Sequence, residues 1–423
     1  MIEPKNKTVR KMVSSSILPE LPVSLVDRYH GNTPFIITPS LAAPVEFWAR
    51  IYGVYSSDQV VIHDMEDLSI VYKVLDFSDL NKKDISDAEK KSIRESTVNQ
   101  AMSEIKSGLD PVLANRLRSQ TGMKNRFEEG VRHSGRYIPI FEKIMILHGM
   151  PPEISRLPFV ESLFNEKAFS KVAAGGLWQF MADSAKKFMT VNSLVDERYD
   201  PLIACHGAAK LLKHNYDLLG TWPLAINAYN SGPGNLMKAM NALGTKDIAK
   251  IINGYRGGSY AFASRNFYPS FLAAIHVYEN RKKYFGNITL DPLMTFDMAE
   301  LPTTMSFPEI AYLSQTSLNE LKSLNPAFNP NVIRGAYSLP PGSQVRVPQG
   351  SLNIFAARFL DFKASPEAPD LHIVDSGETY ESIAQSYGVS HQDLEHINNL
   401  GPSLRDGLVI QIPPTNSLVK REK

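Results

Sequence analysis

Residues 134–290 form a long succession of helical stretches separated by short breaks that contain glycine and proline. The breaks read MPP, AAGG, SGPGN and YRGGS, and between them no segment shows the pattern of a strand. Helices without a sheet to cover must bury their apolar faces against one another. We therefore predict a compact all-helical domain over about 131–290.

The chain is long enough to hold further domains on both sides of this helical region. Its 423 residues correspond to about two to four domains of ordinary size. Residues 1–45 are rich in Pro, Ser and Lys without a sustained period, which predicts a tail or an extended lead-in. Residues 46–130 are predicted to be mostly helical, although VVIHD and LSIVYKVLDF are compatible with a hairpin.

Near residue 295 the sequence pattern changes from helices alone to helices combined with short strands. Residues 371–414 predict a strand, two helices and a closing strand. Residues 295–349 carry a degenerate copy, because SLNELKSLNP and HQDLEHINNL share the pattern L-x-x-[LI]-N. Residues 350–370, which contain SPEAPD, are predicted to be a linker. The expected fold class is mainly α, with small α+β modules of βααβ order.

Charge, cysteine content and hydropathy argue against several classes of protein. The net charge of +1 supplies no general attraction to nucleic acid, so no nucleic-acid partner is predicted. One cysteine allows no intramolecular disulfide, and no HExxH or CxxC motif is present, so no zinc site is expected. No apolar run approaches the length of a membrane span. The first twenty residues lack the apolar core of an export signal.

A single carboxylate stands out in the stretch VESLFNEKAFSKVAAGGLWQF, residues 160–180. If residues 154–164 are helical, Glu161 shares one stripe with Ile154, Leu157 and Phe164, although Pro158 should kink this helix. Burial would raise the pKa of the carboxyl and keep it protonated near neutral pH, as a general acid requires. The alternatives are a core glutamate whose oxygens are satisfied by hydrogen bonds, and a glutamate whose side chain extends to a helix end.

Two further motifs surround this carboxylate. Ser170 lies nine residues on, and Gly176 and Gln179 follow in GGLWQ. The stretch WPLAINAYNSGPGN then runs a helix into a glycine-rich stop and contains Tyr229, for which a pocket position and a core position are both open. Together, E-S-x(7)-S-x(5)-G-L-W-Q and A-Y-N-x-G-x-G resemble the lytic transglycosylase family, of the membrane-bound murein transglycosylase D type.

The resemblance implies a goose-lysozyme-like helical domain that cleaves the β-1,4 bond between N-acetylmuramic acid and N-acetylglucosamine in peptidoglycan. It implies Glu161 as the single general acid and base, with a 1,6-anhydromuramoyl product. This chemistry requires neither a metal nor an organic cofactor. The residues that map to the substrate site are Ser170, Gly176, Gln179, Tyr229 and Asn230. A goose-lysozyme-type hydrolase, a catalytically silent peptidoglycan-binding scaffold and a chitin-directed hydrolase are the alternatives.

The third family element departs from its usual form. Where the family carries E-T-R-x-Y-V-P, this chain has ASRNFYP, with Ala263 for the glutamate and Phe267 for the tyrosine. Tyr268, the next residue, is the candidate substitute for the missing tyrosine, although neighbouring helical residues point about 100° apart.

The 371–414 unit matches H-x-V-x-x-G-[ED]-T-x-x-x-I-A-x-x-Y-G-V-S and resembles the LysM domain. That resemblance implies binding of glycans that contain N-acetylglucosamine, with Gly377, Glu378 and Thr379 as the candidate contacts. Such a substrate places the protein in the bacterial periplasm or cell envelope. The given chain shows no export signal, which is compatible with one that has been removed.

Overall fold

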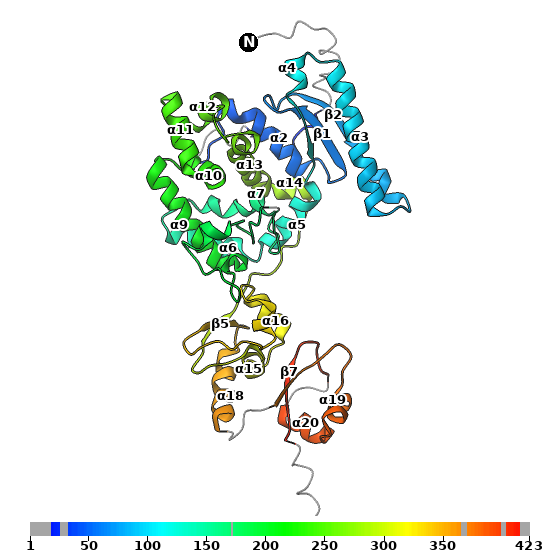
Figure 1. Ribbon diagram of the computed structural model, residues 1–423, viewed down its shortest axis with the longest axis vertical. Helices are drawn as coiled ribbons and strands as arrows, with labels where there is room; N and C mark the ends of the chain where they lie inside the picture. Colours follow the sequence, from blue (N-terminus) through cyan, green and yellow to red (C-terminus); the bar gives the residue numbers. More distant parts are fainter. Residues whose placement is uncertain (1–17, 26–32, 171, 365–369, 399–402, 415–423) are drawn as a thin grey trace, which may run out of the picture. The chain divides into compact units, whose positions relative to one another are not determined.

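The computed structural model describes residues 18–25, 33–170, 172–364, 370–398 and 403–414 (Figure 1). The chain divides into two units. The first comprises Met1–Met181 with Ala204–Leu293, and the second comprises Ala182–Ile203 with Met294–Lys423. Each unit is described by itself.

The first unit opens with a small sheet and its covering helices. Apolar residues before the first long helix already belong to its core, because Phe35 and Ile37 are fully buried and the Phe35 ring meets the edge of Phe271 at 5.2 Å. Of the two expectations for residues 1–45, this stretch therefore fits an extended lead-in and not a tail. The elements are η3 (Pro39–Leu41), α2 (Ala42–Gly53), β1 (Gln59–Asp64), β2 (Val71–Asp76), η4 (Ser78–Lys82), α3 (Asp87–Ser107), α4 (Pro111–Ala114) and β3 (Leu117–Thr121).

The sheet is antiparallel with the strand order β2-β1-β3, so β1 is its centre. The hairpin over VVIHD and LSIVYKVLDF is β1–β2, but β3 lies in a segment that the sequence pattern assigned to helix. The strand LRSQT has a single buried apolar residue, Leu117, and no β-branched run, so its local pattern is weak. Pairing with the buried strand β1 decides its conformation.

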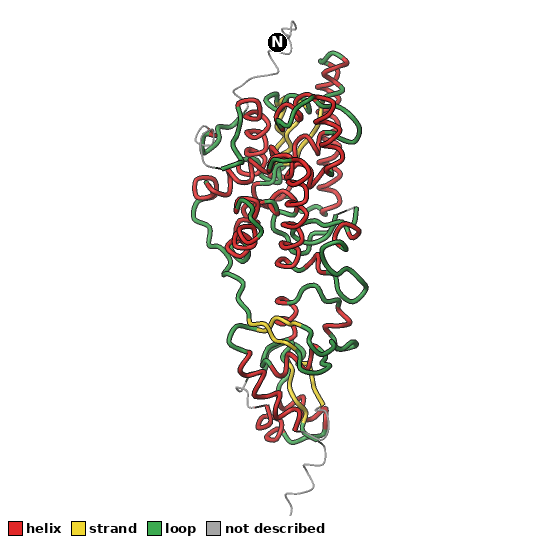
Figure 2. The backbone as a smooth tube through the Cα atoms, turned by 90° about the vertical axis from the view of Figure 1, so that its left-hand side faces the viewer, coloured by secondary structure: helices red, strands yellow, loops and turns green. Residues whose placement is uncertain are grey.

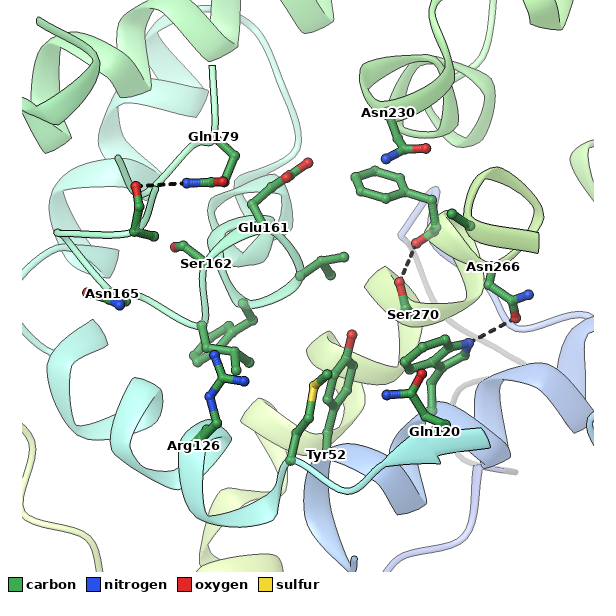
Figure 3. Close-up of a pocket in the computed structure, with 18 of the residues that line it drawn as sticks. Tyr52, Gln120, Arg126, Glu161, Ser162, Asn165, Gln179, Asn230, Asn266 and Ser270 are labelled. Atoms are coloured by element: carbon green, nitrogen blue, oxygen red, sulfur yellow. Dashed lines mark hydrogen bonds between the residues drawn. The ribbon is translucent and has the colours of Figure 1, made fainter. Parts of the chain in front are cut away.

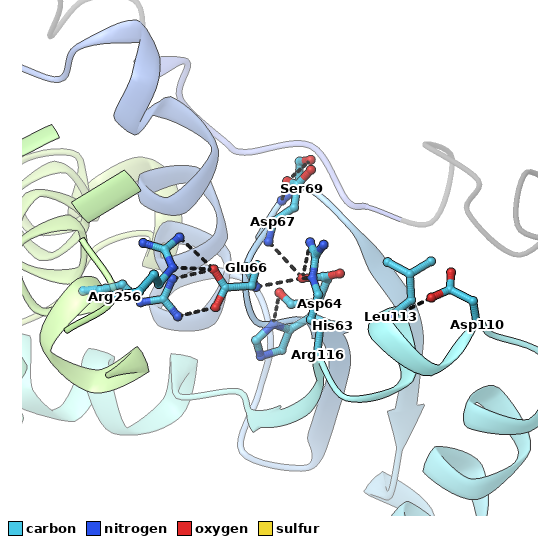
Figure 4. Close-up of polar contacts among 10 residues, drawn as sticks. His63, Asp64, Glu66, Asp67, Ser69, Asp110, Leu113, Arg116 and Arg256 are labelled. Atoms are coloured by element: carbon cyan, nitrogen blue, oxygen red, sulfur yellow. Dashed lines mark hydrogen bonds and ion pairs between the residues drawn. The ribbon is translucent and has the colours of Figure 1, made fainter. Parts of the chain in front are cut away.

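A cluster of hydrogen-bonded ion pairs links this sheet to the helices that follow (Figure 4). Glu66, just after β1, receives Arg265 through two hydrogen bonds of 2.6 and 2.5 Å, and Arg256 at 2.8 Å. The Arg265 guanidinium is the main reason that the pKa of Glu66 is lowered to about 2. On the other side, the fully buried Asp64 accepts from Arg116 at 2.9 Å. The sheet is thus a fixed wall of the first unit.

The remaining elements of the first unit are helical, as Figures 1 and 2 show. Helix α13 contains sixteen buried residues of eighteen and packs against α2, α7 and α10. A helix that is buried on every side is the central element of its domain. The elements are α5 (Lys124–Ser134), α6 (Ile138–Leu147), η5 (Pro152–Arg156), α7 (Pro158–Glu161), α9 (Pro201–Leu219), α10 (Trp222–Ser231), α11 (Pro233–Leu243), α12 (Ile248–Gly254), α13 (Phe262–Glu279) and α14 (Arg281–Phe285).

The second unit contains two segments with the same strand–helix–helix–strand order. In the first, β4 (Asp297–Glu300) pairs with β5 (Gln344–Val347) around α15 (Phe307–Leu313), α16 (Leu318–Leu324) and an additional α17 (Pro330–Ile333). In the second, β6 (Asp370–Ile373) pairs with β7 (Val409–Ile412) around α19 (Tyr380–Tyr387) and α20 (His391–Asn398). The unit also holds α8 (Ala182–Ala185) and η6 (Glu197–Tyr199).

The repeated asparagine of the L-x-x-[LI]-N pattern makes equivalent hydrogen bonds in both segments. Asn325 donates to the carbonyls of Leu321 and Arg346 and accepts from the Arg346 amide. Asn398 donates to the carbonyls of Leu394 and Gln411 and accepts from the Gln411 amide. Each asparagine therefore joins the second helix of its segment to the closing strand.

The predicted linker is partly a helix. Residues Leu352–Ala364 form α18, and Phe355 is buried in the core of the first βααβ segment. Residues 365–369 of SPEAPD lie outside the described part of the chain. Within the described residues, no helix is long and apolar enough to span a membrane.

Candidate active site

Glu161 is the last residue of α7 and lines an open cavity of about 700 Å³. Figure 3 shows its carboxylate directed into the cavity, with Gln179 to one side and Asn230 across from it. Among the lining residues, Glu161 is the only one with an acidic side chain. Its pKa is raised from 4.5 to about 8 by burial.

The backbone around Glu161 differs from the single helix expected over 154–164. Pro158 begins a new helical turn rather than kinking an existing one, because a proline at the first position loses no helical hydrogen bond. The turn ends at Glu161, and both Leu163 and Phe164 have positive φ, near 55°. Glu161 thus projects from the end of a helix, not from its apolar stripe.

Contacts on three sides hold this strained turn. The Ser162 hydroxyl donates to the Leu177 carbonyl at 2.9 Å, which joins the turn to the GGLWQ segment. On the other side, Gly130 of α5 lies so close that a Cβ there would stand 2.5 Å from the Leu163 carbonyl oxygen. The Phe164 side chain is buried against the rings of Phe159 and Phe141. Packing from three directions therefore fixes the position of the Glu161 backbone.

Two predicted substrate residues line the cavity. Gln179 has a positive φ of 48°, and its amide group donates to the carbonyls of Gly176 and Ala168 at 2.8 and 3.2 Å. Asn230, at the end of α10, is exposed and accepts from Ser264 at 3.3 Å. Both side chains are therefore held in place and face the same cavity as Glu161 (Figure 3).

Three other residues predicted to contact the substrate do not line the cavity. The Ser170 hydroxyl accepts from the Ala174 amide at 2.9 Å. Gly176 is buried with a φ of 75° and supplies the carbonyl that Gln179 binds. The Tyr229 hydroxyl donates to the Trp178 carbonyl at 2.8 Å, and burial raises the pKa of Tyr229, with the charge of Glu161 adding to this. In this structure all three shape the loops that carry the site.

The expectation that Tyr268 lines the site is not met. Tyr268 is buried with 1% exposure, whereas Phe267 contributes to the cavity wall. The reason is the helical step of about 100°, which turns neighbouring side chains of α13 in different directions. The cavity receives an apolar ring at the place where the family carries a tyrosine.

Sequence reasoning missed the contribution of residues 46–130 to the cavity. One wall comes from α2, β3 and the start of α5 (Figure 3). Arg118 and Gln120 alternate along β3, which is the period that brings two side chains to the same face of a strand. That alternation is the only local signal. The lining residues from this region are Trp48, Tyr52, Arg118, Gln120, Met123 and Arg126.

The LysM candidates lie in the turn that precedes α19. Thr379 caps this helix, and Gly377 is exposed with a φ of 89°. Glu378 contacts His372 at 2.7 Å and accepts from the Asp375 amide at 2.8 Å, and these bonds lower the pKa of Glu378. The turn is therefore well ordered by its own hydrogen bonds, and its role in glycan contact stays a prediction.

The raised pKa of Glu161 has a consequence for stability. A folded-state pKa of about 8 against 4.5 means that the folded protein holds this proton more tightly. The resulting stabilisation is complete below about pH 4.5 and is lost as the pH rises through about 8. We expect Glu161→Gln, which cannot ionise, to raise the free energy of unfolding at pH about 9 by on the order of 3 kcal/mol.

Urea denaturation of both proteins across this pH range measures the effect. The two curves should meet near pH 4, where the glutamate is also neutral. A constant difference between them at every pH would contradict a buried, titrating Glu161.

Two segments of the chain match known protein families, and the first of them includes several residues of this cavity. Residues 139–252 match the Transglycosylase SLT domain, and residues 372–413 match the LysM domain. The chain therefore carries an SLT domain and a C-terminal LysM domain. The SLT match includes Glu161, Gln179 and Asn230 but not the wall from residues 46–130. The expected fold class, mainly helical with small α+β modules, is confirmed.

Two curated proteins are similar in sequence to parts of this chain. Membrane-bound lytic murein transglycosylase D of Escherichia coli (strain K12) is 28% identical over 281 residues, which are 62% of this chain and 60% of that protein. The chain thus spans about 60% of the length of this curated relative. A putative tributyltin chloride resistance protein of Alteromonas sp. (strain M-1) is 31% identical over 99 residues, covering 23% of this chain and 48% of that one.

Two solved structures are similar to parts of this chain. The 70 kDa soluble lytic transglycosylase of Escherichia coli has a TM-score of 0.30 and 22% identity, covering 34% of this chain and 24% of that chain. The lytic transglycosylase Slt of Pseudomonas aeruginosa has a TM-score of 0.27 and 18% identity, covering 38% and 25%.

Proposed function

We propose that this protein is a peptidoglycan lytic transglycosylase that cleaves the β-1,4 bond between N-acetylmuramic acid and N-acetylglucosamine. The observation that carries the proposal is a lone carboxyl, Glu161, in a cavity that Gln179 and Asn230 of the family motif also line. Ordinary glycosidases need a second carboxyl as nucleophile or base. A reaction in which the substrate provides its own nucleophile needs only one.

In the proposed mechanism, Glu161 first donates its proton to the glycosidic oxygen. A carboxyl with a pKa of about 8 is mostly protonated at neutral pH and is suited to this step. The resulting carboxylate then accepts the proton of the C6 hydroxyl of muramic acid, whose oxygen closes on C1. This gives the 1,6-anhydromuramoyl end, and Glu161 regains its proton. The intramolecular attack benefits from a high effective molarity.

Neighbouring groups support these steps by position. Gln179 and Asn230 face the carboxylate and offer amide groups to the sugar or its N-acetyl substituent (Figure 3). The Tyr229 hydroxyl, bound to the Trp178 carbonyl, holds the loop that carries Gln179. We assign the LysM domain to peptidoglycan glycan strands, which would raise the local substrate concentration. The site of action would be the periplasm or cell envelope.

Product analysis tests the proposal against a goose-lysozyme-type hydrolase. Digested sacculi should yield muropeptides with 1,6-anhydro ends, each lighter by one water than the hydrolysis product, in mass spectrometry. Reducing ends in their place would assign the protein to the hydrolases. Binding to sacculi without any cleavage would identify a scaffold, and release of products from chitin oligomers alone would identify a chitin-directed enzyme.

A further inference from the structure

The walls of the active-site cavity carry an excess of positive charge. Arg118, Arg126 and Lys167 line the cavity and are exposed, and Glu161 is the single acid. None of the three cations forms an ion pair with a carboxylate among the residues that the structure describes. The chain as a whole has a net charge of only +1, so this excess is local.

The segments that carry these cations are positioned by the surrounding structure. Arg118 lies on β3 opposite His63, and its guanidinium stacks on the Phe262 ring at 4.3 Å. Arg126 belongs to the first turns of α5, where the amides of Met123 and Lys124 bond to the carbonyls of Ile51 and Tyr55 at 2.7 and 2.9 Å. Lys167 follows the catalytic turn. The cations thus come from three segments that meet at one cavity.

A second cavity extends this arrangement. It has a volume of about 420 Å³ and shares Arg126 and Lys167 with the active-site cavity. Its other charged groups are largely paired, since Arg136 stands 3.9 Å from Glu166 and His133 stands 2.9 Å from Asp291. Arg126 and Lys167 therefore mark the junction of the two cavities. A ligand that reaches from one cavity into the other passes both side chains.

We propose that Arg118, Arg126 and Lys167 form a subsite for the carboxylates of the peptide stems on the glycan strand. This inference rests on the proposed function. The sugar backbone offers neutral hydroxyl and N-acetyl groups, whereas the stems, attached through the lactyl group of muramic acid, carry free carboxylates. Guanidinium groups pair with carboxylates through two parallel hydrogen bonds. The enzyme would then favour strands with peptides over bare strands and over chitin oligomers.

Binding experiments in a Glu161→Gln background test the subsite without turnover. Three ligands would be titrated by calorimetry: soluble strands with intact stems, strands stripped by an amidase, which keep the lactyl carboxylate of muramic acid, and chitin oligomers, which have no carboxylate. Arg126→Gln and Lys167→Gln should each weaken binding of the peptide-bearing strands by about tenfold. Their loss should be smaller on stripped strands and absent on chitin oligomers. Lys143→Gln, which removes an exposed cation of α6 outside both cavities, is the matched control.

The outcomes separate this inference from the proposed function. Preference for peptide-bearing strands that falls with either substitution, and falls with rising salt in the unsubstituted protein, supports the subsite. Equal weakening on both strands, or none on either, overturns it even if the wild-type protein forms anhydro products. If the wild-type protein cleaves no strand at all, the proposed function fails, while the binding preference still tests the subsite. Thermal unfolding of each variant excludes a folding defect.

Discussion

Glu161→Gln is expected to lower kcat/KM on peptidoglycan strands by on the order of 10³-fold or more. The amide has nearly the same shape as the protonated carboxyl, but it can neither give a proton to the glycosidic oxygen nor take one from the C6 hydroxyl. Because Glu161 alone supplies an acidic group to the cavity, no lining residue can replace it. Release of soluble muropeptides from sacculi measures the effect.

The matched control is Glu153→Gln. Glu153 is half-buried in η5, eight residues before Glu161, and does not line the cavity. This variant should retain wild-type turnover. The near-ultraviolet circular dichroism of Glu161→Gln should match that of the wild-type protein, since no hydrogen bond of the Glu161 side chain exists among the described residues to be lost. Full activity of Glu161→Gln would reject the catalytic assignment.

Gly130→Ala is expected to be strongly destabilising although it adds only a methyl group. The new Cβ would stand 2.5 Å from the Leu163 carbonyl oxygen and 3.1 Å from its carbon, and a backbone group cannot rotate away. We expect a loss of about 2–3 kcal/mol in the free energy of unfolding. Since Leu163 lies two residues after Glu161, the relief of this clash should also displace the carboxylate and lower kcat. Urea denaturation and turnover would be measured together.

Gly234→Ala provides the comparison for this prediction. Gly234 also lies within a helix, α11, but a Cβ there meets nothing within 4 Å. The substitution should leave stability unchanged or raise it slightly, because glycine in a helix costs about 0.5–1 kcal/mol relative to alanine. If both variants lost equal stability, backbone conformation and not the contact with Leu163 would be the cause.

The local sequence predicted the structure correctly where the residues of a single element contain the whole pattern. The Gly/Pro breaks between amphipathic stretches indicated helices, and L-x-x-[LI]-N indicated a repeat whose asparagines make equivalent bonds. The same reasoning failed for β3, whose strand conformation depends on pairing with β1 across about fifty residues. It also failed at Glu161, where the helix ends instead of continuing to Phe164. Local periodicity does not register strand pairing or a turn held by distant packing.

The sequence by itself determined the identity of the acid and its spacing to Gln179 and Asn230, because chemistry requires particular residue types at particular offsets. Only the tertiary structure decided what encloses that acid. The residues of the wall from α2, β3 and α5, which include Arg118 and Arg126, precede Glu161 by about 35 to about 113 positions. Glu66 links this wall to α13 through Arg265 and to the segment after α12 through Arg256. Burial, and with it the raised pKa of Glu161, is a property of this enclosure, since desolvation depends on every neighbour in space rather than in sequence.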